Sequence, residues 1–149
     1  MPDPRPATPE DIGALRRLAE RAYLTYVPRI GRKPAPMVAD FAGHVDRGEV
    51  YVLAGGSGLA GYIVTFEAKG AQFVENVAVD PARRGQGLGR RLMAFAEDRA
   101  RAAGLGRLWL YTNARMTENR DFYISLGYRV TGRRREAGFD RVYLEKDLA

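Results

Sequence analysis

Residues 77–91 read V-A-V-D-P-A-R-R-G-Q-G-L-G-R-R and decide the fold of this chain. They begin as an apolar strand that an Asp-Pro pair ends. A turn with three glycines follows, and from residue 87 to 103 apolar residues recur at helical spacing. A further strand is expected over residues 108–112. The order strand, helix, strand predicts a right-handed crossover between two parallel strands, 71–79 and 108–112.

The rest of the chain adds helices and strands around this unit. Thr8 and Pro9 favour a helix start, because threonine can accept from the unpaired first amides and proline suits the first turn. Residues 31–36 are rich in proline and predict a loop. We expect helices over residues 8–23, 37–45, 87–103 and 118–126, and strands over residues 50–54, 59–66, 71–79, 108–112, 128–134 and 141–144. This order predicts an α/β fold with a mixed sheet.

The composition sets limits on the class of protein. The 149 residues predict a single domain over 1–149 with a core of ordinary size. The chain has no cysteine and one histidine, which excludes disulfides, thiolate or multi-histidine metal sites and an acyl-cysteine intermediate. No apolar run approaches the roughly 20 residues that span a bilayer. The N-terminus carries prolines and acids instead of a signal peptide, so we expect a cytoplasmic protein without metal or membrane contact.

The charge is the least ordinary feature. Basic residues number 24 and acidic residues 18, for a net charge of +6, and 21 of the basic residues are arginines. Arginine favours phosphate through its bidentate fork, so an anionic partner is one interpretation and a solvated surface is the other. The sequence has no aromatic–basic motif or recognition helix, so we do not expect nucleic acid as a partner.

The glycine-rich turn predicts a phosphate site. Glycine lets the backbone approach a ligand closely, and the helix that follows offers unpaired N–H groups and a positive dipole end. The turn lacks the Lys-Ser or Lys-Thr of a Walker loop and the third glycine of a dinucleotide fingerprint. What remains is R-x-x-G-x-G, at Arg84, Gly87 and Gly89. A turn that only connects strand to helix is the alternative.

Two blocks give the chain a resemblance to the GCN5-related N-acetyltransferases (GNAT). Residues 76–93, N-V-A-V-D-P-A-R-R-G-Q-G-L-G-R-R-L-M, contain the acyl-CoA signature, and residues 118–128, E-N-R-D-F-Y-I-S-L-G-Y, resemble a later block of that family. The element order from residue 8 to 144 follows the family too. The resemblance implies a mostly antiparallel sheet with helices on both faces, and direct acetyl transfer from acetyl-CoA to a primary amine in a ternary complex. A non-catalytic acyl-CoA-binding or interaction module with this fold stays open.

The resemblance also implies which residues hold acetyl-CoA. The strand before the turn would pair its backbone with the pantetheine arm, in the gap where this strand and 108–112 separate. Asn119 matches an asparagine that commonly reaches the cofactor. The pyrophosphate would lie on the amides around Arg84, Gly85, Gln86, Gly87, Leu88, Gly89 and Arg90, and the pantetheine arm on Val77, Ala78 and Val79.

Two residues are candidates for proton transfer. The resemblance implies that Tyr123 lies near the sulfur, where its hydroxyl would protonate the leaving thiolate; core packing is the alternative. Glu75 lies in an apolar strand just before Asn76 and is the candidate general base. Its alternatives are a solvent-facing carboxylate or one that only binds a cationic substrate. For the single histidine, His44, we expect no catalytic role.

The acceptor side is the least determined by the sequence. In the resembling family it is shaped by the first two helices and the last hairpin, so we expect Tyr23, Tyr26, Arg29 and Lys33 to bind the acceptor amine. Arg29, Arg32 and Lys33 hint at an acidic or carboxylate-bearing acceptor. Exposed sheet edges often pair between subunits, so a homodimer is a further expectation.

Overall fold

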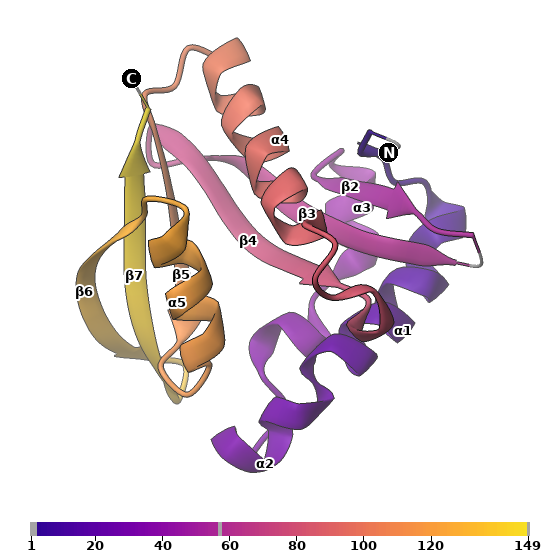
Figure 1. The fold of residues 1–149 in the computed structure, drawn as a ribbon, viewed down its shortest axis with the longest axis horizontal. Helices are drawn as coiled ribbons and strands as arrows, with labels where there is room; N and C mark the ends of the chain where they lie inside the picture. The colour runs from indigo at the N-terminus through magenta and orange to yellow at the C-terminus, as the bar shows by residue number, and fades with distance from the viewer. Residues whose placement is uncertain (1–2, 57, 149) are drawn as a thin grey trace.

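A computed structural model describes residues 3–56 and 58–148 (Figure 1). Within these residues seven strands form one sheet, in the order β1-β2-β3-β4-β5-β7-β6. The strands are β1 (Arg5–Pro6), β2 (Val50–Ala54), β3 (Leu59–Ala68), β4 (Ala71–Val79), β5 (Arg107–Asn113), β6 (Arg129–Glu136) and β7 (Phe139–Asp147). The helices are α1 (Ile12–Tyr23), α2 (Val27–Ile30), α3 (Phe41–Asp46), α4 (Leu88–Ala102) and α5 (Thr117–Ser125), with short 3-10 turns η1 (Pro9–Asp11), η2 (Leu24–Tyr26), η3 (Ala35–Val38) and η4 (Pro81–Arg83).

The sheet is mixed and mostly antiparallel, as predicted. Only β4 and β5 run parallel, and α4 connects them; all the other neighbouring pairs are antiparallel. The predicted crossover is therefore confirmed. Helices α1 and α3 pack on one face of the sheet and α4 and α5 on the other, which confirms the expected arrangement (Figure 1).

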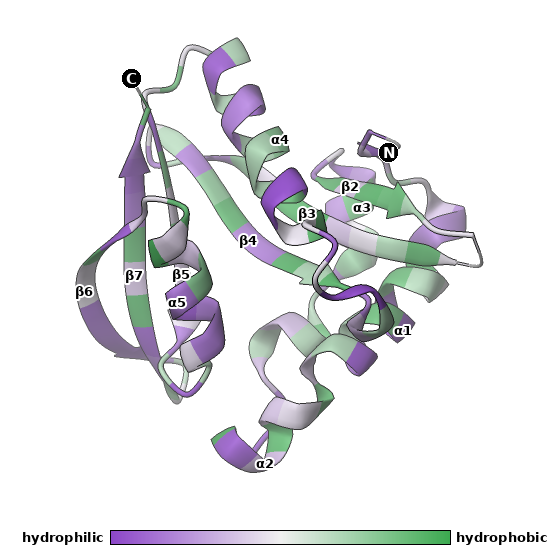
Figure 2. Ribbon diagram, in the orientation of Figure 1, coloured by the Kyte–Doolittle hydropathy of each residue, from purple (hydrophilic) through white to green (hydrophobic). Residues whose placement is uncertain are grey.

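Alternation along the strands builds the two halves of the core. In β3, Tyr62 and Val64 face α1 and α3, whereas Ile63 between them faces α4. This is the period of two that places successive strand side chains on opposite faces. Figure 2 shows β4 mostly green and the turn into α4 purple, so an apolar strand ends at a charged turn.

The first helix begins where the sequence predicts. The Asp11 carboxylate accepts the Thr8 backbone N–H at 2.8 Å and the Arg5 guanidinium at 2.9 Å. The hydrogen bond from Arg5 lowers the pKa of Asp11 below its usual value. From there α1 buries Leu15 and Leu18 against the sheet.

One local prediction is wrong, and two short elements were not predicted. Residues 37–45 do not form one helix: η3 occupies Ala35–Val38, and α3 begins only at Phe41. The reason is Asp40, whose carboxylate accepts from the Gly43 amide at 3.1 Å and so caps a new helix. The sequence also gave no indication of α2 or of β1, which are too short for a periodic pattern.

The feature that positions the site is the separation of β4 from β5. These strands pair only from Gln72–Val74 to Leu108–Leu110, after which they diverge (Figure 1). Along its other edge β4 continues beside β3, where Val64 pairs with Asn76 but Thr65 with Val74. Glu75 is thus the extra residue of a β-bulge, a device that redirects a side chain.

Candidate active site

A cleft of about 640 Å³ lies where β4 and β5 diverge. Its walls come from the end of α1, the last residues of β4, the glycine-rich turn and α5. Past Val74, β4 has no neighbouring strand on its β5 side. Backbone groups need partners when they are buried, so this edge suits an extended ligand with amide groups.

The glycine-rich turn forms the anion-binding end of this cleft. Gly85 and Gly87 have φ of +83° and +76°, backbone angles that residues with a Cβ rarely adopt. The first hydrogen bond into α4 runs from the Arg91 amide to the Gly87 carbonyl, so the amides of residues 88–90 lack an intrahelical acceptor. A Cβ on Gly89 would lie 3.1 Å from the Phe122 ring, so this glycine lets α5 approach. The turn therefore presents free N–H groups and a dipole end to the cleft.

Most of the predicted cofactor residues line this cleft together. Arg84 and Arg90 lie in its wall, and neither forms an ion pair with a carboxylate of the described residues. Gln86 is exposed and does not line it. The predicted residues in the wall are Val77, Ala78, Val79, Arg84, Gly85, Gly87, Leu88, Gly89, Arg90 and Asn119.

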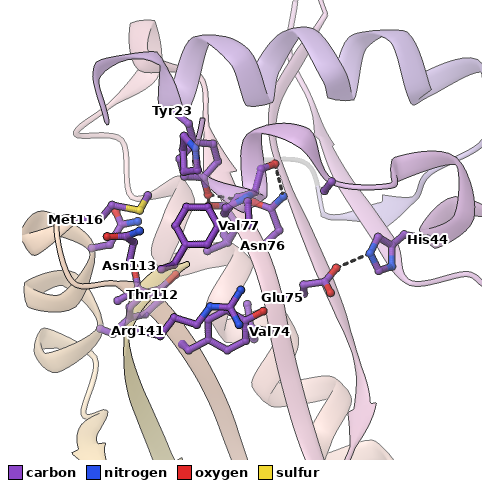
Figure 3. A pocket seen from close by; sticks show the side chains of 18 of the residues that line it. Tyr23, His44, Val74, Glu75, Asn76, Val77, Thr112, Asn113, Met116 and Arg141 are labelled. Atoms are coloured by element: carbon purple, nitrogen blue, oxygen red, sulfur yellow. Dashed lines mark hydrogen bonds and ion pairs between the residues drawn. The ribbon is translucent and has the colours of Figure 1, made fainter. Parts of the chain in front are cut away.

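A second, smaller pocket of about 280 Å³ adjoins the cleft (Figure 3). It lies between β4, the ends of β5 and β7, and the segment that includes η3. The two cavities share four lining residues: Tyr23, Val77, Asn119 and Tyr123. A group bound in the cleft and a group bound in the pocket would meet at these residues.

Tyr123 lies at this junction and is 6% exposed. Burial raises the pKa of its hydroxyl above the usual range, so the phenol stays protonated at neutral pH. Its hydroxyl makes no hydrogen bond with any described residue, and its ring packs edge-on to Tyr128. Its ring is therefore packed in the core, and its role in proton transfer stays a prediction.

Glu75 extends from the bulge of β4 into the pocket. Its Oε2 is buried and contacts Nε2 of His44, as the dashed line in Figure 3 shows. The other ring nitrogen of His44, Nδ1, lies 2.8 Å from Oε1 of Glu49. The imidazole is 7% exposed and stacks on Phe66, so it is held between two carboxylates.

A buried hydrogen-bond network fixes β4 beside Glu75. The Oδ1 of Asn76 accepts from the hydroxyls of Tyr23 and Tyr62, each at 3.0 Å, and its amide donates to the Pro36 carbonyl. The Tyr23 hydroxyl also lies 2.9 Å from the Val77 carbonyl. Every polar atom of the Asn76 side chain thus has a protein partner, which makes Asn76 a rigid support for its neighbours.

Of the four residues predicted to bind the acceptor, only Tyr23 lines the pocket. Tyr26 and Arg29 line the cleft instead, where both bind Glu118: the Tyr26 hydroxyl donates at 2.9 Å and Arg29 Nη1 at 3.0 Å. The Tyr26 hydrogen bond lowers the pKa of Glu118. Lys33 lines neither cavity. The roles predicted for these residues stay predictions, although the position of Tyr26 and Arg29 favours the coenzyme side.

His44 and Arg141 are among the pocket residues that the sequence did not indicate. His44 was expected to have no catalytic role, because helical spacing shows which face it occupies but not which strand residue lies opposite. Arg141 alternates with Val142 in β7, so only the register with β5 reveals that it reaches the pocket.

The described residues offer neither a metal site nor a membrane-spanning helix. No group of three or more histidine, aspartate or glutamate side chains in them could hold a metal ion. Nor is any helix in this part of the chain both long and apolar enough to cross a membrane.

Comparisons with known proteins agree with this geometry. Residues 46–130 match the family model of the acetyltransferase (GNAT) domain. A segment of 63 residues, 40% of this chain, is 43% identical to a streptothricin acetyltransferase from Streptomyces lavendulae, and it spans 33% of that relative's length.

Solved structures share the fold over almost the whole chain. The ribosomal-protein-S18-alanine N-acetyltransferase from Escherichia coli is 23% identical with a TM-score of 0.77, covering 100% of this chain and 95% of that one. PaiA N-acetyltransferase from Thermoplasma acidophilum, in complex with coenzyme A, is 17% identical with a TM-score of 0.79, covering 97% and 98%. At these identities the likeness is one of fold.

Proposed function

The chain belongs to the acetyltransferase (GNAT) family, and on that premise we propose that it is an acetyl-CoA-dependent N-acetyltransferase. The acceptor is a primary amine of a small molecule or protein, and the transfer is direct while both substrates are bound. One observation above all supports this proposal: the cleft and the pocket meet at Tyr23, Val77, Asn119 and Tyr123. Two substrates that enter from opposite sides would react there.

The residues of the cleft fit coenzyme A. The free amides at the start of α4, with Arg84 and Arg90, suit its pyrophosphate, and the unpaired edge of β4 suits the amides of its pantetheine arm. When bound, acetyl-CoA supplies an activated acetyl thioester. The protein's contribution is to orient it, with Asn119 at the point where the two cavities meet.

Two side chains handle the protons. The amine must lose a proton to become nucleophilic, and Glu75, which lines the pocket, would receive it. The other carboxylate of the lining, Asp40, caps α3 instead. Because Oε2 of Glu75 is buried against His44, Oε1 is the oxygen left for the amine. His44 acts as a positioning residue for Glu75 and links it to Glu49. Tyr123 keeps a proton on its hydroxyl at the junction, where a departing thiolate needs one.

The test is a thiol-release screen with acetyl-CoA against polyamines, aminoglycosides, amino acids and peptides. We expect one class to release free thiol well above the rate of hydrolysis, with the acetylated amine identified by mass spectrometry. Coenzyme A binding without release for any amine would instead favour the non-catalytic module.

Two finer points belong to the same proposal. We place the protein in the cytoplasm, and we expect it to form a homodimer. The support for a dimer is β6, which is exposed over most of its length at one edge of the sheet. Light scattering that gives a monomer mass at micromolar concentration would reject the dimer.

A further inference from the structure

Two arginines converge on one aromatic ring at the wall of the acceptor pocket. Arg141 lines the pocket from β7, with its Cζ 4.3 Å from the ring centroid of Tyr111 and 6.0 Å from that of Phe139. Arg32 reaches the same Phe139 ring from the segment before η3, at 4.1 Å. Both guanidinium groups thus contribute positive charge to this side of the pocket.

Only one of the two guanidinium groups has an anionic partner among the described residues, and that ion pair is long. Arg141 is 16% exposed, and its nearest carboxylate, Glu136, lies 3.7 Å from Nη1, beyond hydrogen-bond distance. Glu136 already accepts from the hydroxyl of Tyr143, which lowers the pKa of Glu136. Arg32 forms no ion pair within the part of the chain that the structure describes.

A structural arginine in the same sheet looks different. Arg129 of β6 binds Glu145 at 2.6 Å and Asp147 at 3.1 Å, so both of its terminal nitrogens donate to carboxylates. The donors of Arg141 are more buried than those of Arg129, yet no carboxylate lies within hydrogen-bond distance of them in the described residues. This contrast leaves N–H groups of Arg141 available to an anion from outside the chain.

The opposite wall of the pocket carries the opposite charge. Glu75 enters from β4 and Arg141 from β7, and no ion pair links them. Figure 3 shows Arg141 reaching across from β7 towards the β4 side. The lining also includes apolar side chains, such as Val74 and Met116, and a second carboxylate, Asp40, which accepts from the Gly43 amide. A pocket with a carboxylate on one wall and a guanidinium on the other complements a ligand with an amine and an anionic group.

We propose that the acceptor is a small zwitterion of the amino-acid type, whose amine lies at Glu75 and whose carboxylate is bound by Arg141, with Arg32 at the rim. The volume of about 280 Å³ suits a molecule of that size. This inference rests on the proposed function and specifies its acceptor.

Matched pairs of acceptors test it. Tyrosine and tyramine, histidine and histamine, and lysine and cadaverine differ by a carboxylate alone, and the amino-acid amides restore size without charge. We expect kcat/KM to be about 10- to 100-fold higher for the acid of at least one pair, the range for a charge-assisted bidentate contact. Arg141→Met should abolish this preference, because it raises KM for the acid more than KM for the plain amine.

Arg134→Met is the control. Arg134 also stacks on a ring, that of Tyr143 at 4.8 Å, but it is exposed and does not line the pocket, so the preference should survive. Arg32→Gln should weaken the preference less than Arg141→Met, because Arg32 lies at the rim.

Calorimetry with coenzyme A present measures the same preference without turnover. The inference is supported if Arg141→Met no longer binds the acid and Arg134→Met still does. If amines are acetylated with no preference for the acid, or if Arg141→Met slows acid and amine equally, the inference is overturned while the proposed function stands. If no amine is acetylated, the proposed function fails and calorimetry still decides whether the carboxylate site exists.

Discussion

The coenzyme cleft and the acceptor pocket are built in different ways. The cleft is mostly backbone: free amides of α4, positive-φ glycines and the open edge of β4. The pocket consists of side chains from β4, β5, β7, α3 and η3, which lie far apart in the chain. A backbone site needs a local motif, whereas a side-chain site needs the folded sheet. For this reason a coenzyme site can be predicted from a local sequence motif, whereas a proposal for the acceptor needs the folded sheet.

The largest expected effect breaks the backbone site. Gly87→Glu should weaken coenzyme A binding by more than about 100-fold, because a side chain at φ +76° is strained and its charge opposes the pyrophosphate at the start of α4. Calorimetry measures the dissociation constant. Gly104→Glu, with a similar φ of +73° at the far end of α4, is the matched control and should bind normally. Equal losses in both variants would mean that the effect is one of folding.

The next effect belongs to the side-chain site alone. Glu75→Gln should lower kcat by about 100-fold, since the amine loses its proton acceptor, and leave the affinity for coenzyme A unchanged. Steady-state kinetics with the best acceptor and calorimetry with coenzyme A separate the two. A wild-type kcat in this variant would leave Glu75 as a carboxylate that only binds the amine.

A smaller effect on kcat is expected at His44, which contacts Glu75. His44→Gln should lower kcat by about 10-fold and change the shape of the pH–rate profile, because the imidazole between Glu75 and Glu49 is lost. Phe66→Leu removes the ring that stacks on His44 but keeps the imidazole, so its profile should keep the wild-type shape. If both variants slow the enzyme with unaltered profiles, His44 is only a packing residue.

The smallest effect concerns stability at the junction. Burial raises the pKa of Tyr123, so the folded chain holds this proton more tightly than the unfolded chain does. The contribution of this proton to the free energy of unfolding is complete below the pKa of the unfolded chain, about 10. It is lost as the pH rises above that value. Tyr23, Tyr62 and Tyr128 shift in the same direction through burial. The free energy of unfolding, measured in urea, should therefore fall between about pH 9 and 11. In Tyr123→Phe the slope of this fall should be smaller by the equivalent of about one proton. A flat dependence in the wild type would contradict the burial of these phenols.

Elements with a strong local pattern could be predicted from the sequence, and elements fixed by one distant contact could not. The crossover through α4 and the strand 71–79 are confirmed because glycine, proline and apolar spacing specify them locally. The break at Asp40 depends on one carboxylate that caps α3, and the continuous pattern of residues 37–45 conceals it. Similarly, the strand that carries Glu75 could be predicted, but the contact of Glu75 with His44 could not. That contact joins a strand and a helix that meet only when the sheet has formed.

The separation of β4 from β5 also has a consequence for the chain's thermodynamics. Only three residue pairs join these strands, and beyond them the sheet has a gap that a ligand can fill. Coenzyme A bound in this gap would bind the folded chain alone and raise its melting temperature in proportion to the logarithm of its concentration. On the proposed function, bound coenzyme A would take the place of a neighbouring strand beside β4, and its concentration would help to hold the two halves of the sheet together.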